Sequence, residues 1–505
     1  MGLSAVIKND MSEEESKMKI VQVVDRYKKS DGVGNVVTAL DELLRKNHYD
    51  TAICSRLLEH EDISSDLFIG DTILFYHLAL LMDPIVKYLD CKKVLVFHNI
   101  TEPELLVGTE EEDRIRCSAG LYNAARTADY FDYAIAFSEY SRKCLIEMGW
   151  KKEDVFVLPI IVRLDKFSMP PSSAIIDKYK GRSVNVLFTG RVHPNKKQED
   201  VIAAFAAYKE LYHNDSKLFL VGKTSRGSYY SSLCAYVERL NLTRDVVFLG
   251  HVGFEEYLSY YHIADIYLCM SEHEGFCIPL VEAMYFQIPI LAYGSTAIPD
   301  TLSGSGVLLD NKVPQNVAKI MNEIVTDKNY RQTVVDGQNA RMEQLHPEIL
   351  EKQYAEVLDG IVGSLREKRS IQPITDKDSN KYRFTILINL ARQIEDLGKR
   401  CDRYVVYGAG SAGAKLYREL KREGLGDRLA LCDSFMGGEY SSELGVAILS
   451  PEEAVELHGN DVFIISIQDK PAIVEIALFL VGKGIRKEQI ALYDMAADLI
   501  NGVGD

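Results

Sequence analysis

The sequence of 505 residues lacks any long apolar run, and it contains a single tryptophan and only 14 prolines. Its longest apolar stretches, such as residues 476–481, fall well short of the roughly 20 residues that a membrane-spanning helix needs. The first 19 residues are polar and acidic, without the apolar core of a secretory signal. We therefore expect neither a membrane span nor a signal peptide.

Cysteine is also sparse and scattered. The nine cysteines form no Cys-x-x-Cys pair, and their number is odd. This pattern is typical of reduced thiols rather than of a disulfide framework. We expect a cytoplasmic protein. A position at the inner face of the membrane is an alternative, because Lys143, Lys151 and Lys152 form a small basic cluster that could make a peripheral contact; a solvated surface is the simpler interpretation of that cluster.

Positive charge is in deficit. The 58 basic residues are outnumbered by 74 acidic ones, which gives a net charge of −16. Such a balance argues against nucleic acid as the main partner. The apolar share of 47% and the charged share of 26% are ordinary for a globular protein. The length predicts several domains.

Short apolar runs alternate with helix-length amphipathic stretches, which predicts an α/β protein with parallel sheets and crossover helices. We expect a first domain at 1–170, a second at 171–366, a linker and helix at 367–395, and a third domain at 396–505. The predicted strands are 19–24, 72–76, 94–97, 133–137 and 155–158; then 184–188, 217–220, 246–249, 266–270, 289–292 and 306–309; then 404–407, 429–432, 462–467 and 489–492.

The most informative segment is 271–282, which holds two glutamates eight positions apart, Glu274 and Glu282. It follows the predicted strand 266–270, and a helix can open at Pro279, where a missing N–H needs no partner. Both carboxylates should therefore meet at the carboxyl edge of a parallel sheet. Backbone N–H groups at the helix start can bind an anion there. This combination predicts a ligand with hydroxyls and phosphates, such as a nucleotide sugar.

A second motif, Gly-Arg-Val-His-Pro-Asn-Lys, follows the predicted strand 184–188. Arg191 can bind a phosphate through a forked guanidinium, and Lys196 offers a point charge. In the first domain, His98 follows a strand, and Gly32 with Gly34 lies in a turn-rich segment before a helix expected from about Val36. A lone histidine at a strand end is also common as a purely structural residue.

Taken in this order, the motifs resemble those of the family-four retaining glycosyltransferases. The resemblance covers roughly the first three-quarters of the chain. It implies the GT-B architecture, in which two Rossmann-like domains face a cleft, with the donor on the second domain and the acceptor on the first. It also implies transfer of a sugar from a UDP- or GDP-linked donor to a glycan, lipid-linked or other hydroxyl acceptor, without a metal or other required cofactor.

The resemblance further implies residue roles. Glu274 would contact the transferred sugar, Glu282 the ribose, and the two cations the diphosphate. Many members have glycine where this chain has Cys277. The implied catalytic residues are His98, Arg191, Lys196 and Glu274; the implied donor-binding residues are Gly32, Gly34, Val252, Phe276, Cys277, Ile278 and Glu282.

The third domain carries a Gly-x-Gly-x-x-Gly motif between a strand and a helix, formed by Gly408, Gly410 and Gly413. Asp433 ends the next strand, near where dinucleotide-binding folds place a ribose-binding acid. Three interpretations stay open: a nucleotide or nucleotide-sugar site, a scaffold for homo-oligomers or substrate handover, and a fold in which the glycines serve only a tight turn. The acidic pair at 376 and 378 falls in the predicted linker and is interpreted as chance.

Two alternatives to a transferase also remain. One is a non-catalytic protein that binds nucleotide sugars. The other is an epimerase or phosphorylase, since both can share the GT-B architecture.

Overall fold

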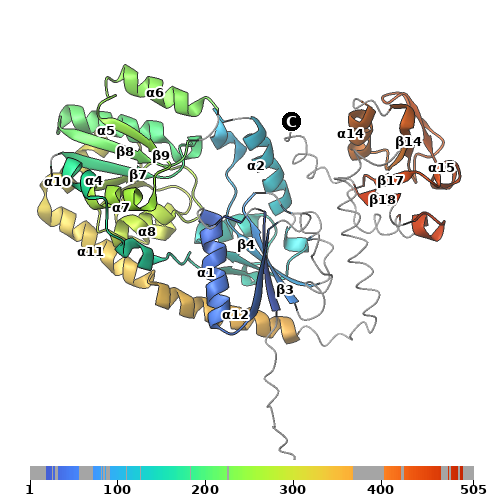
Figure 1. The fold of residues 1–505 in the computed structure, drawn as a ribbon, viewed down its shortest axis with the longest axis horizontal. Helices are drawn as coiled ribbons and strands as arrows, with labels where there is room; N and C mark the ends of the chain where they lie inside the picture. Colours follow the sequence, from blue (N-terminus) through green and yellow to red (C-terminus); the bar gives the residue numbers. More distant parts are fainter. Residues whose placement is uncertain are drawn as a thin grey trace, which may run out of the picture.

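The computed structural model describes most of the chain (Figure 1). The predicted linker beyond residue 367, with its acidic pair at 376 and 378, lies outside the described residues. The described residues are 19–25, 27, 28, 32–55, 72–80, 82, 86, 91–109, 111–125, 127–181, 183–224, 227–367, 403–421, 426–467, 476, 479–486 and 489–492.

The first unit is built on a parallel six-stranded sheet in the order β2-β1-β3-β4-β5-β6. The five strands expected from the apolar runs are present, with ends shifted by one or two residues. The strand β2 was missed because its sequence, Asp-Thr-Ala-Ile-Cys-Ser, mixes polar and apolar residues, as an edge strand can. The strands are β1 (Lys19–Val24), β2 (Asp50–Ser55), β3 (Thr72–Leu78), β4 (Lys92–Phe97), β5 (Tyr133–Ala136) and β6 (Val155–Val157).

The helices of this unit include α1 (Gly32–Lys46), α2 (Glu111–Ala124) and α3 (Glu139–Glu147). Helix α1 begins at Gly32, so the expectation of a glycine-rich turn before a helix from Val36 was wrong. Each glycine costs a helix about 1 kcal/mol relative to alanine, and the packing of the buried face of α1 outweighs that cost. Ser138 caps α3 by accepting a hydrogen bond from the backbone N–H of Ser141 at 3.1 Å, as its position after β5 predicts.

The second unit has its own parallel sheet in the order β12-β11-β10-β7-β8-β9, and all six expected strands are present. These are β7 (Val184–Thr189), β8 (Ser216–Val221), β9 (Val246–Gly250), β10 (Ile266–Cys269), β11 (Ile290–Tyr293) and β12 (Val307–Leu309). Its helices are α4 (Ser173–Tyr179), α5 (Gln198–Leu211), α6 (Tyr229–Arg239), α7 (Phe254–Ile263), α8 (Ile278–Tyr285), α9 (Ile298–Leu302), α10 (Pro314–Thr326) and α11 (Lys328–Gln344).

Helix α12 (Pro347–Glu367) follows the second unit in sequence but packs on the first. The Tyr354 hydroxyl donates to the carbonyl oxygens of Leu158 and Pro159 at 3.2 and 3.1 Å. Figure 1 shows α12 reaching back to α1.

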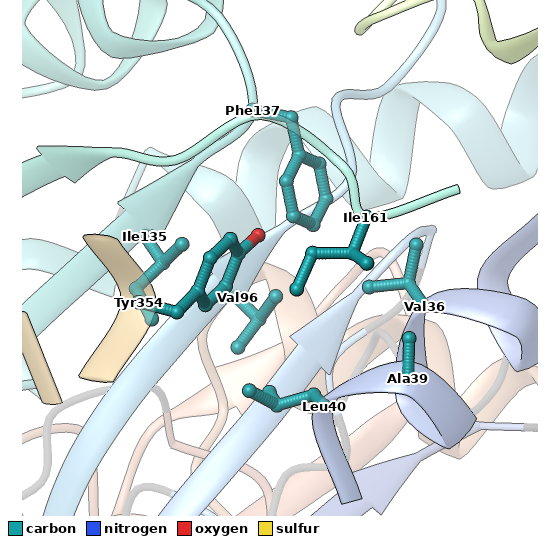
Figure 2. A pocket seen from close by; sticks show the side chains of 8 residues that line it. All are labelled: Val36, Ala39, Leu40, Val96, Ile135, Phe137, Ile161 and Tyr354. Carbon is teal, nitrogen blue, oxygen red and sulfur yellow. The ribbon is translucent and has the colours of Figure 1, made fainter. Parts of the chain in front are cut away.

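Tyr354 also lines a small cavity of about 10 Å³, which Figure 2 shows from close by. The lining of that cavity is apolar and it has room for about one water, so it is a packing gap rather than a ligand site.

The third unit is a mixed six-stranded sheet in the order β15-β16-β14-β13-β17-β18. The four expected strands are present, and the missed pair, β15 and β16, forms the antiparallel edge. No helix among the residues described is long and apolar enough to span a membrane. The strands are β13 (Tyr404–Tyr407), β14 (Leu429–Cys432), β15 (Tyr440–Ser441), β16 (Val446–Leu449), β17 (Val462–Ile465) and β18 (Ile490–Leu492), with helices α14 (Ser411–Leu420) and α15 (Pro451–His458).

Candidate functional site

The loop between β10 and α8 carries Glu274 at the carboxyl edge of the second sheet. The backbone N–H of Glu274 donates to the Thr296 hydroxyl at 2.9 Å, and the Ser295 hydroxyl donates to the carbonyl of Ser271 at 2.5 Å. The residues that make both hydrogen bonds to this loop come from the turn after β11. Ser295 and Thr296 thus fix the shape of the loop.

Glu274 is paired with a lysine from the other motif. The Nζ atom of Lys196 lies 2.7 Å from Oε1 of Glu274, and their side chains are only 17% and 12% exposed. The Asn195 amide holds the same loop by donating to the carbonyl of His273 at 3.1 Å. A shielded pair of this kind interacts more strongly than a surface pair, and removing one partner leaves an uncompensated charge.

Arg191 is exposed and forms no ion pair with any described residue. Its backbone is fixed, because the Gln198 amide donates to its carbonyl at 2.9 Å. Gly190, before it, has a φ of +148°, and a Cβ at Gly222 on the next strand would lie 1.9 Å from the Gly190 carbonyl oxygen. These two glycines therefore let the ends of β7 and β8 lie side by side. Gly222 was not found from the sequence.

Glu282, in α8, is 9% exposed and anchored through one oxygen. Its Oε2 atom accepts hydrogen bonds from the hydroxyls of Tyr257 and Tyr261, each at 2.6 Å. Burial raises the pKa of Glu282, although the two tyrosine hydrogen bonds oppose this. Oε1 accepts no hydrogen bond from the described part of the chain, so it is the oxygen that a ligand could reach. The tyrosines were missed, although their spacing of four on α7 could have indicated a shared partner.

The start of α8 positions the neighbouring expected residues. Cys277 is the residue before the helix and has a φ of +71°, a left-handed conformation that glycine adopts more readily. Phe276 is buried, and its carbonyl accepts a hydrogen bond from the Thr301 hydroxyl. Ile278, the first helical residue, is half-buried, as is Val252 just beyond β9. The N–H groups of the first turn of α8 are thus presented at the same edge as Glu274.

His98, after β4, belongs to a chain of hydrogen bonds. Its Nε2 lies 3.0 Å from Nδ1 of His77, whose Nε2 lies 2.9 Å from Oε1 of Gln22. The Gln22 amide nitrogen donates to the carbonyl of Val37 at 3.3 Å, which orients the amide so that Oε1 is an acceptor. It follows that His77 donates from Nε2 and His98 donates from Nε2, which leaves Nδ1 of His98 as an acceptor.

Burial lowers the pKa of His98 to about 3, so the imidazole is neutral near neutral pH. Burial also lowers the pKa of His77 well below its ordinary value, with the nearby His98 adding to the effect. Both histidines of this hydrogen-bonded pair are therefore neutral near neutral pH.

The first and second units touch at this site. A Cβ on Gly275 would lie 3.0 Å from both the carbonyl oxygen of His98 and Cβ of Asn99, so this close contact favours glycine. Thr101 and His273 also meet across the units, with Oγ1 and Nδ1 3.1 Å apart. The structure therefore brings the segment after β4 against the loop that carries Glu274.

Gly32 and Gly34 lie in the first turn of α1, at the carboxyl edge of the first sheet. A Cβ on Gly32 would meet no atom within 4 Å, so the backbone there is open to a ligand. The carbonyl of Gly34 accepts a hydrogen bond from the Thr38 hydroxyl at 2.7 Å. Asp31, the preceding residue, lies outside the described residues.

In the third unit, the glycine motif has a tight local geometry. Gly408 has a φ of +115°, and a Cβ on Gly413 would lie 1.7 Å from the Gly408 carbonyl oxygen. Gly410 is exposed and has room for a side chain. Asp433 accepts hydrogen bonds from the backbone N–H groups of Ala409, at 2.7 Å, and of Phe435, at 2.8 Å. Both carboxylate oxygens of Asp433 are thus used to fix loops, which favours the tight-turn interpretation over a free ribose-binding acid.

Comparison with known proteins agrees with this geometry. Residues 175–341 match the family model of the glycosyl transferases group 1. The second unit is a group 1 glycosyl transferase domain. That domain contains the whole of the two motifs, from Gly190 to Glu282, and the expected family is thereby confirmed.

The chain has curated relatives of modest identity. The chain is 25% identical over 194 residues to an uncharacterized 41.2 kDa protein in the cps region of Klebsiella pneumoniae, covering 38% of this chain and 51% of the relative. It is 24% identical over 245 residues to the O-antigen chain mannosyltransferase B of Escherichia coli, covering 47% of this chain and 62% of the relative. The chain thus spans only about half to three-fifths of these relatives.

The fold of the group 1 domain and the unit before it is that of a solved Anabaena protein, HepE, crystallised with UDP and glucose. The TM-score is 0.54 at 18% identity, and the match covers 68% of this chain and 100% of HepE. At this identity the likeness concerns the fold alone. Together with the two parallel sheets, it confirms the expected GT-B architecture.

Proposed function

We propose that the chain is a retaining glycosyltransferase that moves a sugar from a UDP- or GDP-linked donor to an acceptor hydroxyl. The observation that carries this proposal is the pair of Lys196 and Glu274, 2.7 Å apart, beside the exposed Arg191 in a group 1 domain. These groups provide two cations for phosphates and a carboxylate for hydroxyls within one loop cluster.

The reaction breaks the bond between the sugar and the diphosphate, which leaves negative charge on the departing diphosphate. Arg191 and Lys196 would stabilise that charge, since fixed cations at the point where charge develops lower the barrier most. The N-terminal turn of α8 would add backbone N–H donors. Glu274 would then exchange part of its contact with Lys196 for a hydroxyl of the transferred sugar.

Glu282 would hold the donor's ribose through Oε1, while Tyr257 and Tyr261 keep Oε2 in place. A carboxylate that is anchored at one oxygen loses little freedom when it binds a ligand at the other. Val252, at the carboxyl edge of the same sheet, would lie beside the nucleobase.

On the acceptor side, His98 would accept a hydrogen bond at Nδ1 from a substrate hydroxyl. Because its pKa is lowered to about 3, it would act as a neutral positioning group rather than as a proton donor. The O-antigen mannosyltransferase relative supports a hexose donor and a glycan or lipid-linked acceptor. All eight described cysteines are free, which fits our placement of the enzyme in the reducing cytoplasm.

A screen of UDP- and GDP-sugars by thermal shift, followed by product analysis with hydroxyl acceptors, tests the proposal. We expect one donor to raise the melting temperature and to be consumed with retention of anomeric configuration. Glu274→Ala should fold but form no product. Stabilisation by a donor without any product in the wild type would instead identify a nucleotide-sugar-binding protein.

A further inference from the structure

Two thiols lie close to the carboxylate of Glu274, the residue that pairs with Lys196. Sulfur atoms of Cys269 and Cys277 and a carboxylate oxygen of Glu274 all lie within 4.8 Å of one another. Cys269 ends β10, Cys277 precedes α8, and Glu274 lies in the loop between them. The two cysteines are 1% and 7% exposed, so the thiols are shielded while the carboxylate reaches the loop surface.

These three groups have the chemistry of a metal site. In a tetrahedral zinc site the bonds from metal to ligand are about 2.0 to 2.3 Å, which sets the ligand atoms roughly 3.3 to 3.8 Å apart. The ligand atoms therefore need to approach one another by about 1.5 Å at most. Thiolates select thiophilic ions such as Zn²⁺ over Mg²⁺ or Ca²⁺. Three protein ligands leave a fourth position for water or a donor phosphate.

The backbone of Cys277 is a second and separate observation. Its φ of +71° is strained for any residue with a Cβ, and glycine would relieve it. The strained residue directs a thiol toward Cys269 and Glu274, as their distances show. A side chain that served only to fill space would not need to occupy a position that favours glycine.

Lys196 competes with any cation for the same carboxylate. Its ammonium lies 2.7 Å from Oε1 of Glu274, so a metal ion on the same carboxylate would bring a like charge close to the ammonium and weaken that ion pair. We propose that Cys269, Glu274 and Cys277 form a site for a thiophilic divalent cation, which inhibits glycosyl transfer by separating Glu274 from Lys196. Binding releases the two thiol protons and replaces them with two metal–sulfur bonds, without oxidation or reduction. The inhibitory part rests on the proposed transferase function.

The binding part is tested without any sugar donor. The full chain, with its thiols reduced and oxygen excluded, is titrated with Zn²⁺ against a chromophoric chelator, and with Co²⁺, whose thiolate bonds give a charge-transfer absorption. We expect one ion per chain and a cobalt–thiolate band. Cys277→Gly, which relieves the strained backbone and should fold, is expected to lose the band and at least tenfold in zinc affinity. Cys269→Ala is expected to behave in the same way, and Cys234→Ser, on α6, is expected to bind as the wild type does.

Lys196→Ala provides a sharper test. It removes the competing ammonium, so we expect zinc affinity to rise about tenfold or more, whereas adventitious binding to surface thiols would not respond.

The inhibitory part is tested by activity. Sugar transfer by the wild type should fall as the site fills with zinc and recover when a chelator removes the zinc. No stoichiometric binding, or binding that Cys277→Gly leaves unchanged, would overturn the site. Zinc that binds there but leaves transfer unchanged, or a chelator that abolishes transfer, would overturn inhibition. Absence of transfer with every donor would overturn the proposed function while the binding result stands by itself.

Discussion

Lys196 and Glu274 neutralise each other across a distance of 2.7 Å, although 78 positions separate them in the chain. One follows β7 and the other follows β10, and these two strands are neighbours in the second sheet. The pair therefore exists because parallel strands end at the same edge. In the absence of a donor, each charge satisfies the other in a largely shielded place; a bound diphosphate would have to share the lysine.

This relationship predicts the effect of Lys196→Ala. Turnover should fall by about 10²- to 10³-fold, the usual loss when one stabilising group is removed from a developing anion. Donor affinity should fall much less, because the charge acts mainly on the leaving group. Steady-state kinetics and donor titration separate the two effects. Lys319→Ala, at an exposed lysine on α10, is the matched control; equal losses in binding and turnover for Lys196→Ala would contradict the assignment.

Glu282→Gln separates donor binding from stability. Both tyrosine hydroxyls can still donate to an amide oxygen, so the fold should survive. Burial raises the pKa of Glu282. The folded state thus favours the protonated carboxyl of Glu282. The stability that this protonated group contributes is present at low pH and is lost as the pH rises through the pKa of Glu282 in the folded chain. At pH 8 the neutral amide should leave the melting temperature unchanged or raise it, while the KM for the donor rises about tenfold or more, as expected when a hydrogen bond to a charged group is lost. A clear loss of melting temperature would contradict this account.

The hydrogen-bonded chain Gln22–His77–His98 predicts that His77 sets the tautomer of His98. His77→Phe removes the acceptor for Nε2 of His98, so nitrogen chemical shifts of His98 should show a mixture of tautomers. Turnover should fall about tenfold, with little change in donor KM. His48→Asn, at an exposed histidine with positive φ, is the control. If His98 keeps a single tautomer in the His77→Phe variant, His77 does not set the tautomer of His98.

Stability should depend on pH through the buried histidines. Burial lowers the pKa of His98 to about 3 and, with the charge of Lys196, that of His273 to about 4. The ordinary value is 6.5, so the unfolded chain binds more protons below that pH. Stability is fully present above about pH 6.5 and declines as the pH falls toward 4. Denaturant unfolding between pH 7.5 and 5 measures this slope, and His98→Asn should reduce it. An unchanged slope in that variant would contradict the lowered pKa of His98.

The glycine loop of the third unit gives a matched pair of variants. Gly413→Ala would place a methyl group 1.7 Å from the Gly408 carbonyl, so it should destabilise this unit strongly. Gly410→Ala meets open space and should leave the melting temperature within about 1 °C, since surface changes of this kind are usually small. Thermal denaturation of both full-length variants tests the prediction. Nucleotide protection that Gly410→Ala abolishes, with folding intact, would favour a ligand site over a tight turn.

The sequence predicted the strands well because fully buried parallel strands are nearly continuous apolar runs, as in β7 and β10. It missed β2, an edge strand that mixes polar and apolar residues, and the short strands β15 and β16, which lie at the antiparallel edge of the third sheet. The start of α1 was also wrong, since glycines are ordinarily interpreted as turns. These errors share one cause: the local pattern does not reveal which residues the rest of the fold covers.

In the candidate site, the spacing of Glu274 and Glu282 predicted that both glutamates lie near one helix start. It could not predict what they contact. The partners Lys196, Tyr257 and Tyr261 come from other elements, and only the packing of the sheet and of α7 brings them within 2.6 to 2.7 Å. The same holds for the thiols of Cys269 and Cys277, which the sequence shows only as isolated cysteines.

Helix α12 belongs to the second unit by chain order and to the first unit by packing. It follows α11 in the sequence, yet it ends among Ile361, Val362 and Leu365, which pack in a core with residues of the first unit. A chain cut after residue 346 would therefore expose the core of the first unit, although the cut lies beyond the last strand of the second.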